Sequence, residues 1–180
     1  MVEQVELVSP KAIRISKRNK APRWNSRSGL IVLSDSMLNV NAGWGTLILD
    51  TVDSIFPAEG VILDRINRPQ IGDHNPQGWI DELVEQQVSA LIVTAGDCAT
   101  CTSRALRECV LAEHAGIPAT AVLPVDLSEI THATLRAWGR PDLQVATFDT
   151  PLFALKRDDF PEVMRLTAEE AVEIISTTQI

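Results

Sequence analysis

The sequence lacks the features of membrane-spanning, disordered or disulfide-rich proteins. No apolar run approaches the roughly 20 residues of a spanning helix, and no low-complexity tract is present. The N-terminus has acidic residues where a secretory signal needs a basic start. There are only 3 cysteines, an odd number, and all fall within a short stretch, which argues against a disulfide framework. We therefore expect a cytoplasmic protein with reduced thiols and no membrane contact.

The sequence also lacks two common cofactor motifs. No predicted strand is followed by a G-x-G-x-x-G segment, so the dinucleotide-binding fingerprint is absent. Cys98 and Cys101 form a CxxC pair, but no second CxxC or close pair of histidines completes a structural zinc site. We therefore expect neither a metal nor another cofactor.

Charge is distributed unevenly over a chain whose net charge is −8. Residues 1–28 hold seven bases and two acids, a net +5, which leaves −13 for the remainder. Such a basic arm could bind nucleic acid or lie on the acidic surface of its own or a sister subunit. No interleaved aromatics or reading helix accompany the bases, so we favour the subunit surface and expect no nucleic-acid partner. The predicted division is a basic arm, residues 1–28, and a single α/β domain, residues 29–180.

From residue 29 onward, short apolar runs alternate with helical patterns. This alternation predicts an α/β fold: a three-layer, Rossmann-like or flavodoxin-like parallel sheet of about five strands. In the helix that follows the third strand, Thr102 or Ser103 is expected to be the N-cap and Gly116 the end. The predicted strands are 29–33, 59–66, 89–96, 117–124 and 143–148, and the predicted helices are 44–56, 79–88, 101–116, 127–139 and 159–176.

Ligands of parallel sheets gather beyond the carboxyl ends of the strands, where three predicted loops lie: 34–43, 67–77 and 95–101. The first loop carries polar side chains that could bind a ligand, Ser34, Asp35 and Asn39, although the same residue types are ordinary in turns. His74 in the second loop is a candidate acid or base.

The third loop carries the CxxC pair at the start of a predicted helix. A thiol there faces unpaired backbone N–H groups and the positive end of the helix dipole, which favour the thiolate. Because Cys98 and Cys101 are three positions apart, they could also close a disulfide. Asp97 could act as a base or orient a substrate, and Thr102 and Ser103 could hold an anionic group beside the helix N–H groups.

The remaining cysteine and two histidines are assigned structural positions. Cys109 falls on the apolar face of the predicted helix, so we expect it to be an inert core residue. His114 and His132 lie on predicted helices and are expected to face solvent.

The segment 98-CATC-101, preceded by Gly96-Asp97 and followed by Thr102-Ser103, resembles the UGSC family, named for its selenocysteine-glycine-serine-cysteine motif. The likeness covers roughly residues 29–176, including 113-EHAGIPATAVL-123, Asn39 and 149-DTPLF-153. The segment is also similar, more remotely, to the selenoprotein B subunits of the glycine, sarcosine and betaine reductases. Cys98 stands at the selenocysteine position, and Ala99 and Thr100 replace glycine and serine.

The resemblance implies a thiol-dependent redox enzyme. Cys98 would be the nucleophile in reductive cleavage of a carbon–heteroatom bond of a small, anionic substrate, and Cys101 the resolving thiol. A thiol reductant or partner subunit would regenerate the site, in a homo- or hetero-oligomer. Arg104 stands where the reductases have a further cysteine, and a thiol is less nucleophilic than a selenol. The alternatives are a transferase or lyase that works through a covalent Cys98 adduct, and a non-catalytic binding or assembly subunit.

Overall fold

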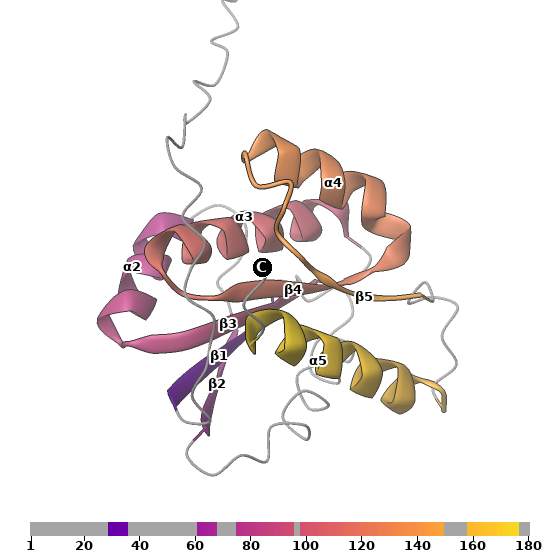
Figure 1. Cartoon of the computed structure of the whole chain (residues 1–180), viewed down its shortest axis with the longest axis horizontal. Coiled ribbons are helices and arrows are strands. Elements are labelled where there is room, and N and C mark those ends of the chain that lie inside the picture. The colour runs from indigo at the N-terminus through magenta and orange to yellow at the C-terminus, as the bar shows by residue number, and fades with distance from the viewer. Residues whose placement is uncertain (1–28, 36–60, 68–74, 96–97, 150–157, 177–180) are drawn as a thin grey trace, which may run out of the picture.

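The computed structural model describes residues 29–35, 61–67, 75–95, 98–149 and 158–176 (Figure 1). Within these residues a five-stranded sheet has the order β2-β1-β3-β4-β5, and every neighbouring pair is parallel. This is the order of flavodoxin-like folds, so the predicted α/β fold is confirmed. The strands are β1 (Gly29–Asp35), β2 (Val61–Asn67), β3 (Val88–Thr94), β4 (Ala119–Pro124) and β5 (Ala146–Phe148).

The described helices cover both faces of the sheet. Helices α2, α3 and α4 lie on one face and α5 on the other (Figure 1). Among the described residues, no helix is long and apolar enough to span a bilayer. The helices are α2 (Pro76–Glu85), α3 (Ala99–Ala115), α4 (Ser128–Ala137) and α5 (Phe160–Ser176), and a short 3-10 turn, η2 (Val125–Leu127), precedes α4.

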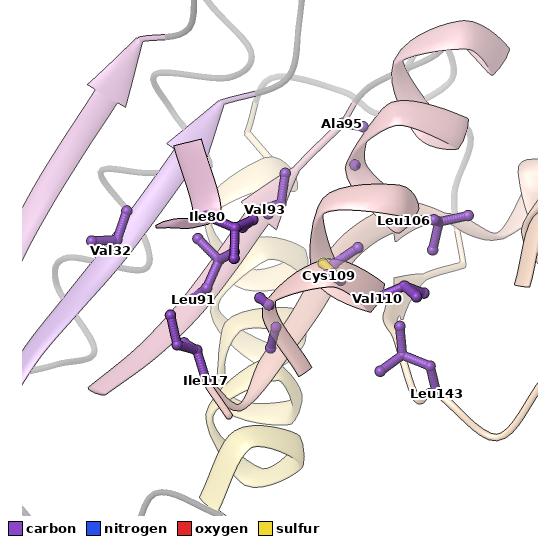
Figure 2. Close-up of a cluster of buried hydrophobic side chains, with 14 of the residues drawn as sticks. Val32, Ile80, Leu91, Val93, Ala95, Leu106, Cys109, Val110, Ile117 and Leu143 are labelled. Atoms are coloured by element: carbon purple, nitrogen blue, oxygen red, sulfur yellow. The ribbon is translucent and has the colours of Figure 1, made fainter. Parts of the chain in front are cut away.

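Two apolar clusters fill the space between the sheet and its helices. Along β3, Leu91 and Val93 belong to the α3 side, and Ala90 and Ile92 belong to the α5 side. Because both sets are fully buried, the strand appears in the sequence as a continuous apolar run and not as an alternating one. Cys109 lies in the α3-side cluster beside other apolar residues of that helix and is fully buried, as expected (Figure 2).

The helix ends follow local signals that the sequence carries. Asn75 caps α2, because its Oδ1 accepts a hydrogen bond from the Gly78 N–H at 3.2 Å, and Pro76 occupies the first turn. Gly116 ends α3 with a φ of 89°, a left-handed conformation that favours glycine. The Ile117 N–H then donates to the Ala112 carbonyl at 2.9 Å, which closes the end of the helix.

Several local predictions were wrong. Strand β1 runs to Asp35, so Ser34 and Asp35 are strand residues and not loop residues. The N-cap of α3 is Cys98, one turn before the predicted Thr102 or Ser103. His132 is exposed as expected, but His114 is half-buried and its Nε2 is buried without a hydrogen-bond partner. The predicted helix 44–56 lies outside the described residues.

Candidate functional site

The site is positioned by a reversal in the order of the strands. From β1 the chain moves to β2 on one side, and β3, β4 and β5 lie on the other, so β1 and β3 are the neighbours at which the direction changes. Ligands of open parallel sheets bind outside the carboxyl ends of the strands at this point. Cys98 follows the carboxyl end of β3 and begins α3, which places it at this edge.

The carboxyl ends of β1 and β3 are held side by side. In their register Ser34 pairs with Val93 and Asp35 with Thr94. The Thr94 hydroxyl also donates a hydrogen bond to the Ser34 carbonyl at 3.5 Å. The sheet edge next to Cys98 is therefore formed by the hydrogen-bonded ends of β1 and β3.

Cys98 is the N-cap of α3. Its backbone is extended, with φ −106° and ψ 112°, and its Sγ accepts a hydrogen bond from the Cys101 N–H at 3.3 Å. Its carbonyl accepts the Thr102 N–H at 2.9 Å. The sulfur thus takes the place that a Ser, Asp or Asn oxygen usually occupies, facing the first N–H groups and the positive end of the dipole. Cys98 is half-buried, and the position of its sulfur at a helix N-terminus is typical of nucleophilic cysteines.

Cys101 has different surroundings from Cys98. It is only 3% exposed and belongs to the apolar cluster between α3 and the sheet. No disulfide joins Cys98, Cys101 and Cys109, all of which the structure describes. The CxxC pair therefore consists of one accessible thiol and one covered thiol.

The hydroxyl residues that follow the pair also differ from each other. Thr102 is fully buried, and its Oγ1 has no hydrogen-bond partner. Ser103 shares a hydrogen bond of 3.3 Å with the Thr134 hydroxyl on α4. Arg104 pairs with the buried Glu108 carboxylate at 3.1 Å along α3. The Thr102 hydroxyl is thus buried without a hydrogen-bond partner, so its environment needs an explanation.

The other predicted site residues are described only in part. Ser34 lies at the site edge with its side chain fully buried. Asp35 is at the same edge, described by its backbone alone. Asn39, His74 and Asp97 lie outside the described residues. No group of three or more His, Cys, Asp or Glu side chains that could hold a metal ion occurs within the described ranges.

Sequence reasoning missed the capping role of the sulfur. The signal was the spacing itself, since an N-cap side chain bonds the N–H two or three residues later, and Cys101 is three residues after Cys98. The signal was missed because Ser and Thr are the more common N-cap residues, and Thr102 and Ser103 follow closely in the sequence.

One protein-family model matches almost the whole chain. Residues 6–177 match the sequence model of the UGSC family. The chain belongs to the UGSC family. The match begins well before residue 29, so most of the basic N-terminal segment falls inside the matched region. No curated protein is significantly similar to the chain.

Proposed function

We propose that this UGSC-family protein is a thiol-dependent redox enzyme in which Cys98 attacks a small anionic substrate and Cys101 resolves the adduct. The observation that carries the proposal is the position of the Cys98 sulfur: half-buried, at the N-cap of α3, beside the strand reversal of a parallel sheet. Nucleophilic cysteines characteristically occupy helix N-termini, and ligands of such sheets bind at this edge.

The described surroundings of the sulfur support an anionic substrate. The first turn of α3 contains no acidic residue, and its backbone N–H donors begin at Ala99, directly after Cys98. A carboxylate beside the attacked carbon would be stabilised by these donors and by the helix dipole. The remote likeness of the CxxC segment to the reductase selenoprotein B subunits supports the same substrate class.

The reaction proceeds in two balanced steps. The Cys98 thiolate attacks the carbon that bears the heteroatom, a carbon–sulfur bond forms, and the heteroatom leaves with the electron pair of its bond to carbon. The Cys101 thiolate then attacks the Cys98 sulfur, and the carbon leaves with the electrons of the carbon–sulfur bond and takes up a proton. The product is a Cys98–Cys101 disulfide, which an external dithiol reduces.

One observation favours a second candidate, a transferase or lyase that works through a covalent Cys98 adduct. Cys101 is 3% exposed and packs among apolar side chains, so in the resting protein its thiol is shielded from substrate. In this alternative Cys98 forms and releases the adduct without a resolving thiol, and no disulfide appears.

Alkylation kinetics test the nucleophile. Iodoacetate and its neutral counterpart iodoacetamide should both modify Cys98 faster than they modify a small-molecule thiol at neutral pH. The ratio of the iodoacetate rate to the iodoacetamide rate should also be higher for Cys98 than for the small-molecule thiol. Peptide mass spectrometry locates the modification, and Cys98→Ser is the matched control. A Cys98 rate equal to that of cysteine in solution would remove the basis of the proposal.

Product analysis separates the two candidates. With iodoacetate and a dithiol such as dithiothreitol, the redox enzyme should release acetate over several turnovers, because each cycle cleaves one carbon–sulfur bond. The Cys101→Ser variant should stop after one carboxymethyl group per chain. If the wild type also stops there and never forms a Cys98–Cys101 disulfide, the redox candidate is rejected and the candidate without a resolving thiol is favoured.

A further inference from the structure

We propose that the covalent state of Cys98 controls access to Cys101. While the Cys98 sulfur is unmodified it caps α3 and keeps Cys101 covered; modification of the sulfur releases the first turn and uncovers the second thiol. The inference rests on the proposed function for its role in a reaction cycle, but its test needs no substrate.

The first observation is that Cys101 contributes both the N–H that bonds the Cys98 sulfur and the buried thiol. A thioether or disulfide sulfur carries no charge and accepts hydrogen bonds weakly, and its substituent occupies the space beside the N–H. An adduct on Cys98 therefore removes the cap from the residue that must react next.

The second observation is the buried hydroxyl in the same turn. Thr102 Oγ1 is fully buried without a partner, an unfavourable state that ends when the turn opens and water reaches the hydroxyl. This feature is independent of the sulfur and biases the same turn toward opening. With the cap present the closed turn is held, and without it the buried hydroxyl favours the open form.

The rest of α3 confines the opening to its first turn. Cys109 is fully buried in the apolar cluster, and Glu113 near the helix end accepts the Ala119 N–H at 3.0 Å. These contacts hold the body of the helix on the sheet while its N-terminus moves. The resolving thiol is thus protected from oxidants and electrophiles until Cys98 has reacted, which sets the order of the two thiols.

The test compares Cys101 labelling by N-ethylmaleimide in Cys98→Ala, which removes the cap, and Cys98→Asp, whose carboxylate restores it. We expect Cys101 to react about fivefold faster in the alanine variant, the factor that corresponds to a typical N-cap contribution of ~1 kcal/mol. Cys109 is the internal reference, because it reacts only when the core opens. Equal Cys101 rates in the two variants would overturn the proposal, and so would parallel acceleration of Cys109.

Wild-type protein carrying a carboxamidomethyl group on Cys98 provides a second measurement that does not depend on the folding of a variant. Its Cys101 should show amide hydrogen exchange and maleimide labelling faster than in the unmodified protein, with Cys109 unchanged. No change in Cys101 would contradict the coupling even if Cys98 is a strong nucleophile. Slow alkylation of Cys98 together with fast labelling of Cys101 after modification would instead reject the proposed function and retain the coupling.

Discussion

The two ends of α3 are secured in different ways. At the N-terminus one half-buried sulfur caps the first turn, and a fully buried hydroxyl in that turn has no partner. At the C-terminus Gly116 closes the helix in a left-handed conformation, and the Glu113 carboxylate accepts the Ala119 N–H at 3.0 Å and forms an ion pair with Arg140 Nη2 at 3.6 Å. The first end is capped by the Cys98 sulfur, whereas the second is tied to β4 and to the segment between α4 and β5.

The Arg140 side chain shows that the C-terminal end of α3 tolerates a buried polar atom without a hydrogen-bond partner. It is 1% exposed and bonds Glu113 and, at 3.3 Å, Asp142, although its Nη1 is buried without a partner. Several independent contacts hold this end of the helix. It therefore stays in place although the Arg140 Nη1 atom makes no hydrogen bond. In the described contacts the N-terminal end is the less constrained one, which agrees with the proposed opening of the first turn.

Breaking the C-terminal end should have the largest effect on stability. Glu113→Gln keeps an oxygen for the Ala119 N–H but removes one of the two carboxylates, Glu113 and Asp142, that pair with the buried Arg140. We expect a loss of about 3 kcal/mol in the free energy of unfolding, measured by denaturant titration. Alkylation of Cys98 in the folded variant should be unchanged, because the substitution lies at the other end of the helix.

Two further variants check this prediction. Glu113→Gln combined with Arg140→Met should recover part of the lost stability, because it removes the buried guanidinium that has lost one of its two carboxylate partners. On α5, Glu162 and Arg165 form an exposed ion pair at 2.7 Å, and hydrogen bonding to Arg165 lowers the pKa of Glu162. Glu162→Gln should leave the denaturation midpoint unchanged, since water competes for both groups. An equal loss in both single variants would show that burial of the Glu113 pair is not the cause.

Removal of the Thr102 hydroxyl tests the N-terminal end of α3. Thr102→Val replaces the buried hydroxyl that has no partner by a methyl group, so we expect no loss of stability and a gain of up to about 1 kcal/mol. The closed first turn should be favoured, and Cys101 should label more slowly. Thr120 on β4 is the matched control: it is equally buried, but its hydroxyl donates to the Gln144 carbonyl at 3.1 Å. Thr120→Val should lose about 1 kcal/mol, and the same loss at Thr102 would contradict the prediction.

The smallest expected effect is a pH dependence at the C-terminal end. Burial, and then the charge of Arg140, lower the pKa of His114 from its ordinary value of 6.5, against a weaker opposite effect of Glu113. The unfolded chain therefore takes up a proton at a higher pH than the folded chain does. The contribution of His114 is constant above the unfolded pKa, and stability falls as the pH drops below it toward the lower folded pKa.

His114→Gln should remove this part of the pH dependence. The measurement is the denaturant midpoint at neutral pH and at several lower values, compared between wild type and variant. His132→Gln on the exposed surface of α4 is the matched substitution and should leave the profile of the wild type intact. A profile that His114→Gln does not alter would assign the acid sensitivity to other groups.

Local pattern was sufficient for most of the described fold. Strands covered on both faces appear as continuous apolar runs, and glycine marks the end of α3, so elements and their boundaries could be predicted to within a few residues. The placement of Cys109 in the core followed from helical periodicity alone. The end of β1 was missed because Ser34 and Asp35 are polar, although backbone pairing with β3 extends the strand through them.

The candidate site was predicted less completely. The sequence indicated that a CxxC pair follows a buried strand and begins a helix, but not which thiol is covered. Cys101 lies on the same face of α3 as Cys109, and the packing of that face against the sheet leaves Cys101 buried while Cys98, at the helix start, is half-buried. The absence of a partner for the Thr102 hydroxyl likewise depends on what surrounds it in three dimensions.

By itself, the sequence determined the alternation of strands and helices and the position of Cys98 between a core strand and the following helix, because both depend on residues close together in the chain. Only the tertiary structure decided that β1 and β3 are neighbours at the strand reversal, that the Cys98 sulfur faces the Cys101 N–H, and that Cys101 is covered while Cys98 is accessible. These features require strand pairing and helix packing between distant segments, whose energies arise from burial and are not carried by any one segment.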